Sequence, residues 1–175
     1  AIFILMITNG AVNFPSSQLL YLIVGYFVST GDLLLVPSIL IGSLGNTIGN
    51  AITFLLIKKH GRPLAQKLLL INKKTFDTLY TTLHETFTER GMWWIFIGKL
   101  TPSVKAFIPI VSGLAKTPNT ITLCIFGVAS VIWATGVTLL GYYFGEHVSL
   151  TSFATVSLLI GITLAFVLYK KFSKT

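Results

Sequence analysis

Long stretches without charged residues dominate the pattern of the chain. Residues 32–57, 119–145 and 149–169 are predominantly hydrophobic, and Asp32 is the only charged residue among them. At a rise of 1.5 Å per residue, each stretch is long enough for a helix to cross a hydrocarbon core of roughly 30 Å. The pattern therefore predicts three transmembrane helices, the last two joined by a tight turn at Glu146 and His147.

Two further hydrophobic stretches, residues 9–31 and 91–118, contain proline and glycine near their middles. Proline interrupts the hydrogen-bond ladder of a helix, and non-helical backbone at membrane depth is tolerated only where protein or water covers it. We therefore expect two re-entrant hairpins, each of which enters and leaves the membrane on the same side. The residues expected to break the helices are Pro15, Pro102, Pro109 and Gly113.

A long polar segment follows the first predicted transmembrane helix. Residues 58–90 contain most of the lysines and arginines, and their hydrophobic residues recur at a partly helical spacing. One interpretation is one or two interfacial amphipathic helices on the inner leaflet; the other is a small loop domain, which would be too short to have its own core. At the start of the chain, residues 1–8 are interpreted as the end of a truncated helix.

The positions of the basic residues predict an orientation. Lysines follow both the helix at residues 32–57 and the last predicted helix, so the positive-inside rule places these ends in the cytoplasm. The two hairpins then enter from opposite faces, and residues 25–57 align loosely with residues 113–145. Inverted repeats whose broken elements meet near the midplane are a transporter architecture. The expected fold is an all-α polytopic membrane protein, one membrane domain over residues 1–175, built as an inverted repeat of re-entrant hairpin plus transmembrane helix.

Composition argues against several functional classes. Hydrophobic residues make up 53% of the 175 residues and charged residues 10%, whereas a soluble domain carries about 25% charged residues. A cytosolic enzyme, a nucleic-acid-binding domain and a disordered chain are therefore disfavoured, despite the net charge of +8. The one cysteine, Cys124, excludes an intramolecular disulfide and a cysteine-cluster metal site, and the three histidines are far apart, so no metal or cofactor is expected. We expect no enzyme, because no nucleophile–base arrangement, phosphate loop or carboxylate pair is suitably placed.

Two lysines in the second broken stretch are the main candidates for function. Lys99 and Lys105 fall at membrane depth, where an uncompensated charge is expensive, while Asp32 and Glu146 lie at helix ends. A lipid phosphate would suit a lysine, which binds it as a point charge. For Lys105 we favour phosphate binding. For Lys99, phosphate binding and snorkelling to the inner interface are about equally supported. For Lys116, snorkelling is the better interpretation. Polar groups that could donate to the same phosphate are Ser16, Ser17, Gln18, Thr101, Ser103 and Ser112.

Short motifs of glycine, proline, lysine and aromatic residues follow one another through both halves of the chain. In the first half they are Phe14-Pro15-Ser16-Ser17, Gly25, Gly45, Gly49 and Lys58-Lys59-His60-Gly61. In the second half they are the basic, proline-containing run at residues 98–109, then Ser112-Gly113-Leu114, Trp133 and Gly141-Tyr142-Tyr143-Phe144-Gly145. Their order and spacing over residues 8–145 resemble the DedA family of membrane proteins, also called SNARE-associated or VTT-domain proteins.

The resemblance implies a lipid-handling protein, because bacterial members of that family are associated with recycling of undecaprenyl phosphate and with phospholipid scrambling. It also implies acids at the positions occupied here by Thr8, Ser17 and Asn50, and arginines at the positions of Lys99 and Lys105. The chain keeps these positive charges without the planar fork of arginine and has no acid at the other three positions. Proton coupling through hairpin carboxylates is therefore not expected.

Together these features predict a multi-pass protein of the bacterial cytoplasmic membrane that translocates or scrambles a phosphorylated lipid, either undecaprenyl phosphate or a phospholipid. Its expected partners are the lipid phosphate head group and the bilayer, with no nucleic acid; a homo-oligomer is left open. An ion-coupled exporter of cations or drugs and a non-transporting membrane scaffold are the alternatives.

Overall fold

The computed structural model describes residues 1–12, 16–69, 91–102 and 104–147, with residues 74, 76–78, 80–82 and 85 between them. Its labelled helices are α1 (Ile2–Val12), α2 (Ser17–Ser29), α3 (Leu35–His60), α4 (Arg62–Leu69), α6 (Trp93–Leu100), α7 (Ile108–Leu114) and α8 (Asn119–His147). No strand occurs within the described residues. The all-helical fold class is therefore confirmed for this part of the chain, and the predicted helix at residues 149–169 lies outside it.

Within the described residues, two helices are long and hydrophobic enough to cross a membrane, Leu35–His60 and Asn119–Gly145. They correspond to the predicted helices at residues 32–57 and 119–145. Helix α3 extends to His60 and ends where Gly61 adopts a φ of 69°, a conformation that glycine reaches without steric cost. Helix α8 continues through Glu146 and His147, which the sequence pattern assigned to a turn; neither residue type interrupts a helix.

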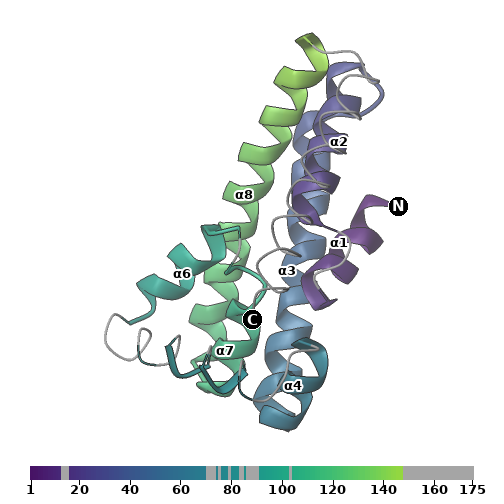
Figure 1. Cartoon of the computed structure of the whole chain (residues 1–175). Coiled ribbons are helices and arrows are strands. Elements are labelled where there is room, and N and C mark those ends of the chain that lie inside the picture. The colour runs from purple at the N-terminus through teal and green to yellow at the C-terminus, as the bar shows by residue number, and fades with distance from the viewer. Residues whose placement is uncertain are drawn as a thin grey trace, which may run out of the picture.

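The short helices pack around the two long ones. Helices α3 and α8 contact each other, α2 lies along the upper part of α8, and α7 lies at the lower end of the molecule (Figure 1). Helix α1 packs mainly on α3, α2 mainly on α8, α6 on α8 and α7 on α3. Each long helix is thus covered by one short helix from the first half of the chain and one from the second.

Glycines permit close approach at two of these helix pairs. Gly10 of α1 lies against Gly49 of α3, and a Cβ at either position would collide with the backbone of the other helix. Gly25 of α2 and Gly141 of α8 are related in the same way. Small residues at such contacts are typical of membrane helix pairs. Helix α1 runs without a break from Ile2 to Val12, although the sequence pattern placed a boundary after residue 8.

Only one of the described predicted breakers ends a helix. Helix α6 ends at Leu100, and Thr101 is extended (φ −94°, ψ 115°), because the residue before Pro102 is sterically driven out of the helical region. Pro109 instead lies in the first turn of α7, where a missing N–H costs nothing. Gly113 lies inside α7, where a Cβ would come 2.8 Å from the carbonyl oxygen of Phe54. Its function is close packing, and Pro15 lies outside the described residues.

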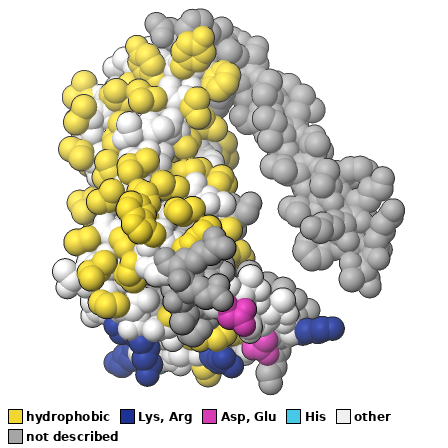
Figure 2. All heavy atoms as spheres, turned by 90° about the vertical axis from the view of Figure 1, so that its left-hand side faces the viewer, with side chains coloured by type: hydrophobic (Ala, Val, Ile, Leu, Met, Phe, Trp, Pro, Cys, Tyr) yellow, Lys and Arg dark blue, Asp and Glu magenta, His cyan; other side chains and the backbone are white. Residues whose placement is uncertain are grey.

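Hydrophobic side chains cover most of the surface in Figure 2, and lysine and arginine gather at its lower end. That end contains the last turn of α3 and helix α4, which carry Lys58, Lys59, Arg62 and Lys67. The outward faces of α3 and α8 expose large hydrophobic side chains, among them Leu40, Leu44, Leu55, Ile132, Leu139 and Leu140. A hydrophobic surface of this extent is unsuited to water and suits the hydrocarbon of a membrane, with the basic end at one of its faces.

Candidate functional site

Lys99 lies in the last turn of α6, and its side chain points into the interior between α3 and α8. Only 7% of its surface is exposed. Its Nζ donates a hydrogen bond of 2.6 Å to Oδ1 of Asn50 on α3, and it lies 5.0 Å from the ring centroid of Phe126 on α8. A cation over an aromatic face is stabilised by the ring quadrupole. The ammonium is therefore compensated by an amide oxygen and an aromatic ring.

A chain of amide side chains extends from Lys99 to helix α1. Lysine can only donate, so the oxygen of Asn50 must face it and the Asn50 amide nitrogen must point away. That nitrogen donates to Oδ1 of Asn46 at 2.8 Å, and Nδ2 of Asn46 donates to Oδ1 of Asn9, also at 2.8 Å. Ser130 on α8 adds a 3.0 Å hydrogen bond to Oδ1 of Asn46. The lysine thus orients successive amide dipoles on α3 and α1, and with Ser130 the network links four helices.

Lys105 lies in the turns between α6 and α7 and is half-buried. Its Nζ donates to the hydroxyl oxygen of Ser17, the first residue of α2, and lies 4.4 Å from the ring centroid of Trp133. The Nε1 of Trp133 is buried and has no hydrogen-bond partner among the described residues. This contact joins the two broken regions of the chain, 88 residues apart.

The two lysines line one small cavity together with Asn46, Ala129, Ser130 and Trp133. Its volume is about 10 Å³, near the minimum for a single water molecule. A phosphate group is much larger than one water, so the cavity must widen before it could admit such a ligand. As it stands, the cavity is therefore too small for a phosphate group.

The described residues supply no carboxylate to either lysine. Asp32 is exposed and accepts a hydrogen bond from Thr30. Asp77 and Glu85 belong to the polar segment after α4. A buried ammonium without a counter-ion is unfavourable. The site thus holds two positive charges close together and compensates them only with neutral groups.

The other predicted site residues that the structure describes form no hydrogen bond with either lysine. Ser112 is fully buried, and its hydroxyl has no hydrogen-bond partner in the part of the chain that the structure describes. Thr101 donates back to the carbonyl oxygen of Ile97 at 3.0 Å, and Ser16 donates to Oε1 of Gln18 at 2.7 Å. None of these four side chains hydrogen-bonds to a lysine in the described part of the chain, and Ser103 lies outside that part.

Sequence reasoning assigned no role in the site to Asn9, Asn46, Ser130 or Trp133. A signal was present, because Asn46 and Asn50 are four residues apart and so share one face of α3. Asparagine is costly inside an uncharged membrane helix unless its amide is hydrogen-bonded. Their common face could therefore have been recognised, but their partners could not.

The VTT domain model matches residues 14–143 of the chain. This range includes both lysines, all of α3, α8 as far as Tyr143 and most of the described short helices. The chain belongs to the VTT-domain, or DedA, family. This membership confirms the resemblance noted from the motifs.

Relatives of this VTT-domain protein are described only as membrane proteins. An uncharacterized membrane protein of Mycobacterium leprae is 29% identical over 100 residues, which cover 57% of this chain and 44% of the relative. The uncharacterized membrane protein YkoX of Bacillus subtilis is 28% identical over 109 residues, covering 61% of this chain and 48% of the relative. The chain thus matches less than half the length of these relatives. No solved structure matches the chain.

Proposed function

We propose that this VTT-domain protein translocates or scrambles a phosphorylated lipid across the bacterial cytoplasmic membrane. The observation that carries the proposal is the convergence of Lys99 and Lys105 on one cavity without a carboxylate among the described residues. A lysine pair of this kind attracts an anion, and in a membrane the abundant anions are lipid phosphates. Lysine binds phosphate as a point charge, so the site would accept undecaprenyl phosphate or a phospholipid and would carry out no chemical step.

The family positions support this assignment. The resemblance places acids at the positions of Ser17 and Asn50 and arginines at those of the two lysines. The structure pairs these positions, since Ser17 accepts from Lys105 and Asn50 accepts from Lys99. Where a relative would hold an internal ion pair, this chain holds a cation with a neutral acceptor. A ligand phosphate could then supply the missing negative charge.

The arrangement of helices supports an inverted repeat of re-entrant hairpins. Helix α2 packs on α8, and its counterpart α7 packs on α3. Gly25 of α2 and Gly113 of α7, separated by the repeat offset, both lie against the backbone of the opposite long helix. Broken elements that meet inside the membrane line the substrate path in many transporters. In this proposal the first hairpin opens to the outer face and the second to the cytoplasm.

The two alternatives receive less support. An ion-coupled exporter of cations would use acids at membrane depth, and the described carboxylates lie at helix ends or in the polar segment. A non-transporting scaffold would give no reason for two lysines to share a cavity without a carboxylate among the described residues.

Transport in reconstituted vesicles tests the proposal. Purified protein is placed in phosphatidylcholine vesicles that contain a fluorescent phosphate-bearing lipid, and quenching of the outer leaflet measures exchange between leaflets. We expect exchange that falls at least tenfold in the double variant with Lys99→Ala and Lys105→Ala. The matched control is Lys59→Ala, an exposed lysine at the end of α3, which should exchange lipid as the unmodified protein does. Exchange that is unchanged in the double variant would refute the proposal.

A further inference from the structure

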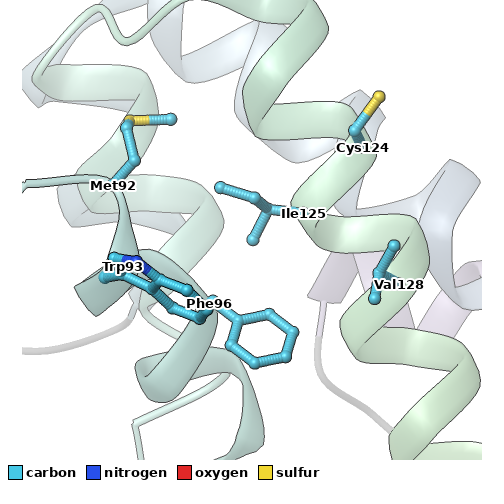
Figure 3. A pocket seen from close by; sticks show the side chains of 6 residues that line it. All are labelled: Met92, Trp93, Phe96, Cys124, Ile125 and Val128. Atoms are coloured by element: carbon cyan, nitrogen blue, oxygen red, sulfur yellow. The ribbon is translucent and has the colours of Figure 1, made fainter.

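A hydrophobic groove lies between the start of α6 and the first half of α8, outside the lysine cavity. Its volume is about 390 Å³, within the range of roughly 300–1,000 Å³ typical of ligand pockets. In Figure 3 Ile125 of α8 points toward Met92 and Trp93, and Phe96 of α6 points toward α8. The lining residues are Met92, Trp93, Phe96, Cys124, Ile125 and Val128.

Helices α6 and α8 contribute to both the groove and the lysine cavity, and the cavity is also lined by Asn46 of α3 and by Lys105. Phe96 lines the groove, and Lys99 follows it by three residues, one turn along α6. On α8, Val128 lines the groove and the next residue, Ala129, lines the cavity. One molecule could therefore reach from the groove into the cavity by crossing about one helical turn.

The groove is open at its side. Trp93 is 71% exposed and Val128 is 54% exposed, and the outward faces of both helices carry further exposed hydrophobic residues, such as Ile97 and Val131. In a membrane such an opening would face hydrocarbon. Among the described residues the lining contains no charged side chain, which favours a hydrophobic occupant over a charged or water-soluble one.

We propose that this groove holds one hydrocarbon chain of a phosphate-bearing lipid while the phosphate lies between Lys99 and Lys105. The proposal rests on the proposed function and adds to it the place of the lipid tail. Complementarity selects this occupant: the hydrophobic groove matches an alkyl chain, and the two lysines of the neighbouring cavity match a phosphate. The head group would then occupy the protein interior while its chain passes sideways between α6 and α8 into the bilayer.

A substitution that fills the groove provides the first test. Val128→Trp adds a large ring to an exposed position, so it removes no core contact. Hexadecyl phosphate is titrated into the protein in phosphatidylcholine nanodiscs, and the rise in melting temperature reports binding. We expect the apparent affinity of Val128→Trp to fall at least tenfold. Val131→Trp is the matched control, because Val131 is exposed on α8 but does not line the groove; its affinity should stay within about twofold of the unmodified protein.

Cys124 provides a second test that needs no substitution. It is the one cysteine of the chain and is exposed, so a benzophenone maleimide attached there can crosslink whatever occupies the groove. Mass spectrometry should find hexadecyl phosphate enriched several-fold over its share of the nanodisc lipid. Hexadecanol should show no enrichment, because it lacks the phosphate. The control carries the label at Leu139→Cys in a Cys124→Ala background and should capture lipids in proportion to their abundance.

The outcomes separate this proposal from the proposed function. If hexadecyl phosphate binds Val128→Trp as tightly as it binds the unmodified protein, and is not enriched at Cys124, the proposal about the groove is wrong. The proposed function of the lysine site is then unaffected. Equal enrichment of hexadecanol would show a general hydrocarbon contact unconnected to the lysines, which also overturns it. Absence of any binding by the unmodified protein would overturn both proposals.

Discussion

Lys99 and Lys105 lie on either side of the same chain break, yet their surroundings differ. Lys99 is nearly inaccessible, and its acceptor, Asn50, is held in turn by Asn46. Lys105 is half-buried and has a single hydroxyl acceptor, that of Ser17, and the face of Trp133. One cation is thus part of an extended network, and the other is held by two local contacts.

This difference suggests that the two lysines have different roles. Removing Lys99 from its network would disturb hydrogen bonds that link α1, α3, α6 and α8. Lys105 can exchange its one hydroxyl acceptor for a ligand oxygen without disturbing other side chains. We therefore expect Lys99 to matter most for stability and for the electrostatic potential of the cavity, and Lys105 to make the direct contact with phosphate.

The largest effect is expected when the acceptor of Lys99 is removed. Asn50→Leu replaces an amide by a side chain of similar size that cannot accept a hydrogen bond, so the buried ammonium loses its acceptor. We expect the free energy of unfolding to fall by about 3–5 kcal/mol, measured by denaturation in detergent. The matched change at the other lysine, Ser17→Ala, should cost only about 1 kcal/mol, because Lys105 is half-buried. Equal losses would contradict the comparison.

Substitutions of Lys105 are expected to change binding more than stability. Lys105→Ala removes a charge-assisted hydrogen bond to phosphate, so affinity for a phosphorylated lipid should fall by about 1.5–3 kcal/mol, or one to two decades. Lys105→Arg should be tolerated, since arginine also binds phosphate, and Lys105→Glu should be worse than alanine. Lipid titration and melting temperature of the three variants measure both quantities. If lost folding accounted for the whole effect, Lys105 would be a structural residue like Lys99.

A carboxylate placed against Lys105 should compete with the ligand. Ser17→Asp restores the acid that the family resemblance implies at this position, and the new anion would pair with the ammonium. We expect a higher melting temperature together with lipid affinity lower by about tenfold, or ~1.4 kcal/mol. Ser16→Asp is the control, because Ser16 is exposed and contacts Gln18 rather than a lysine. Stronger lipid binding in Ser17→Asp would show that Lys105 does not bind the phosphate.

The smallest effect is expected from a proton gradient. Ser17 and Asn50, the neutral partners of the two lysines, do not titrate, so neither can carry a proton between the faces of the membrane. Lipid exchange in vesicles should change by less than about twofold when an imposed pH difference is dissipated with an ionophore. A large fall in the exchange rate would show that another acid, such as Asp32, couples the protein to protons. The Ser17→Asp variant would then be tested for a restored dependence of lipid exchange on the proton gradient.

Local pattern predicted much of the helical layout but not every boundary. The start of α8 at Asn119 and the break before Pro102 follow from hydrophobic length and from proline stereochemistry. Pro109 shows the limit of this reasoning, because a proline breaks a helix or begins one according to its place in the turn. The position of a proline within a helical turn depends on where the helix begins, and the structure of the preceding chain sets that point.

The sequence by itself determined that the chain is a helical membrane protein and that two lysines at membrane depth need compensation. The length of a hydrophobic stretch, the positions of charged residues and the positions of prolines affect the nearby backbone, so their effects can be predicted from the sequence. Only the tertiary structure decided which groups compensate the lysines. Their acceptors, Asn50 and Ser17, lie 49 and 88 residues away along the chain, and the hydrogen bonds exist because close-packed glycines bring α1, α2, α3 and α8 together. Such partners depend on how the helices pack, which no local pattern encodes.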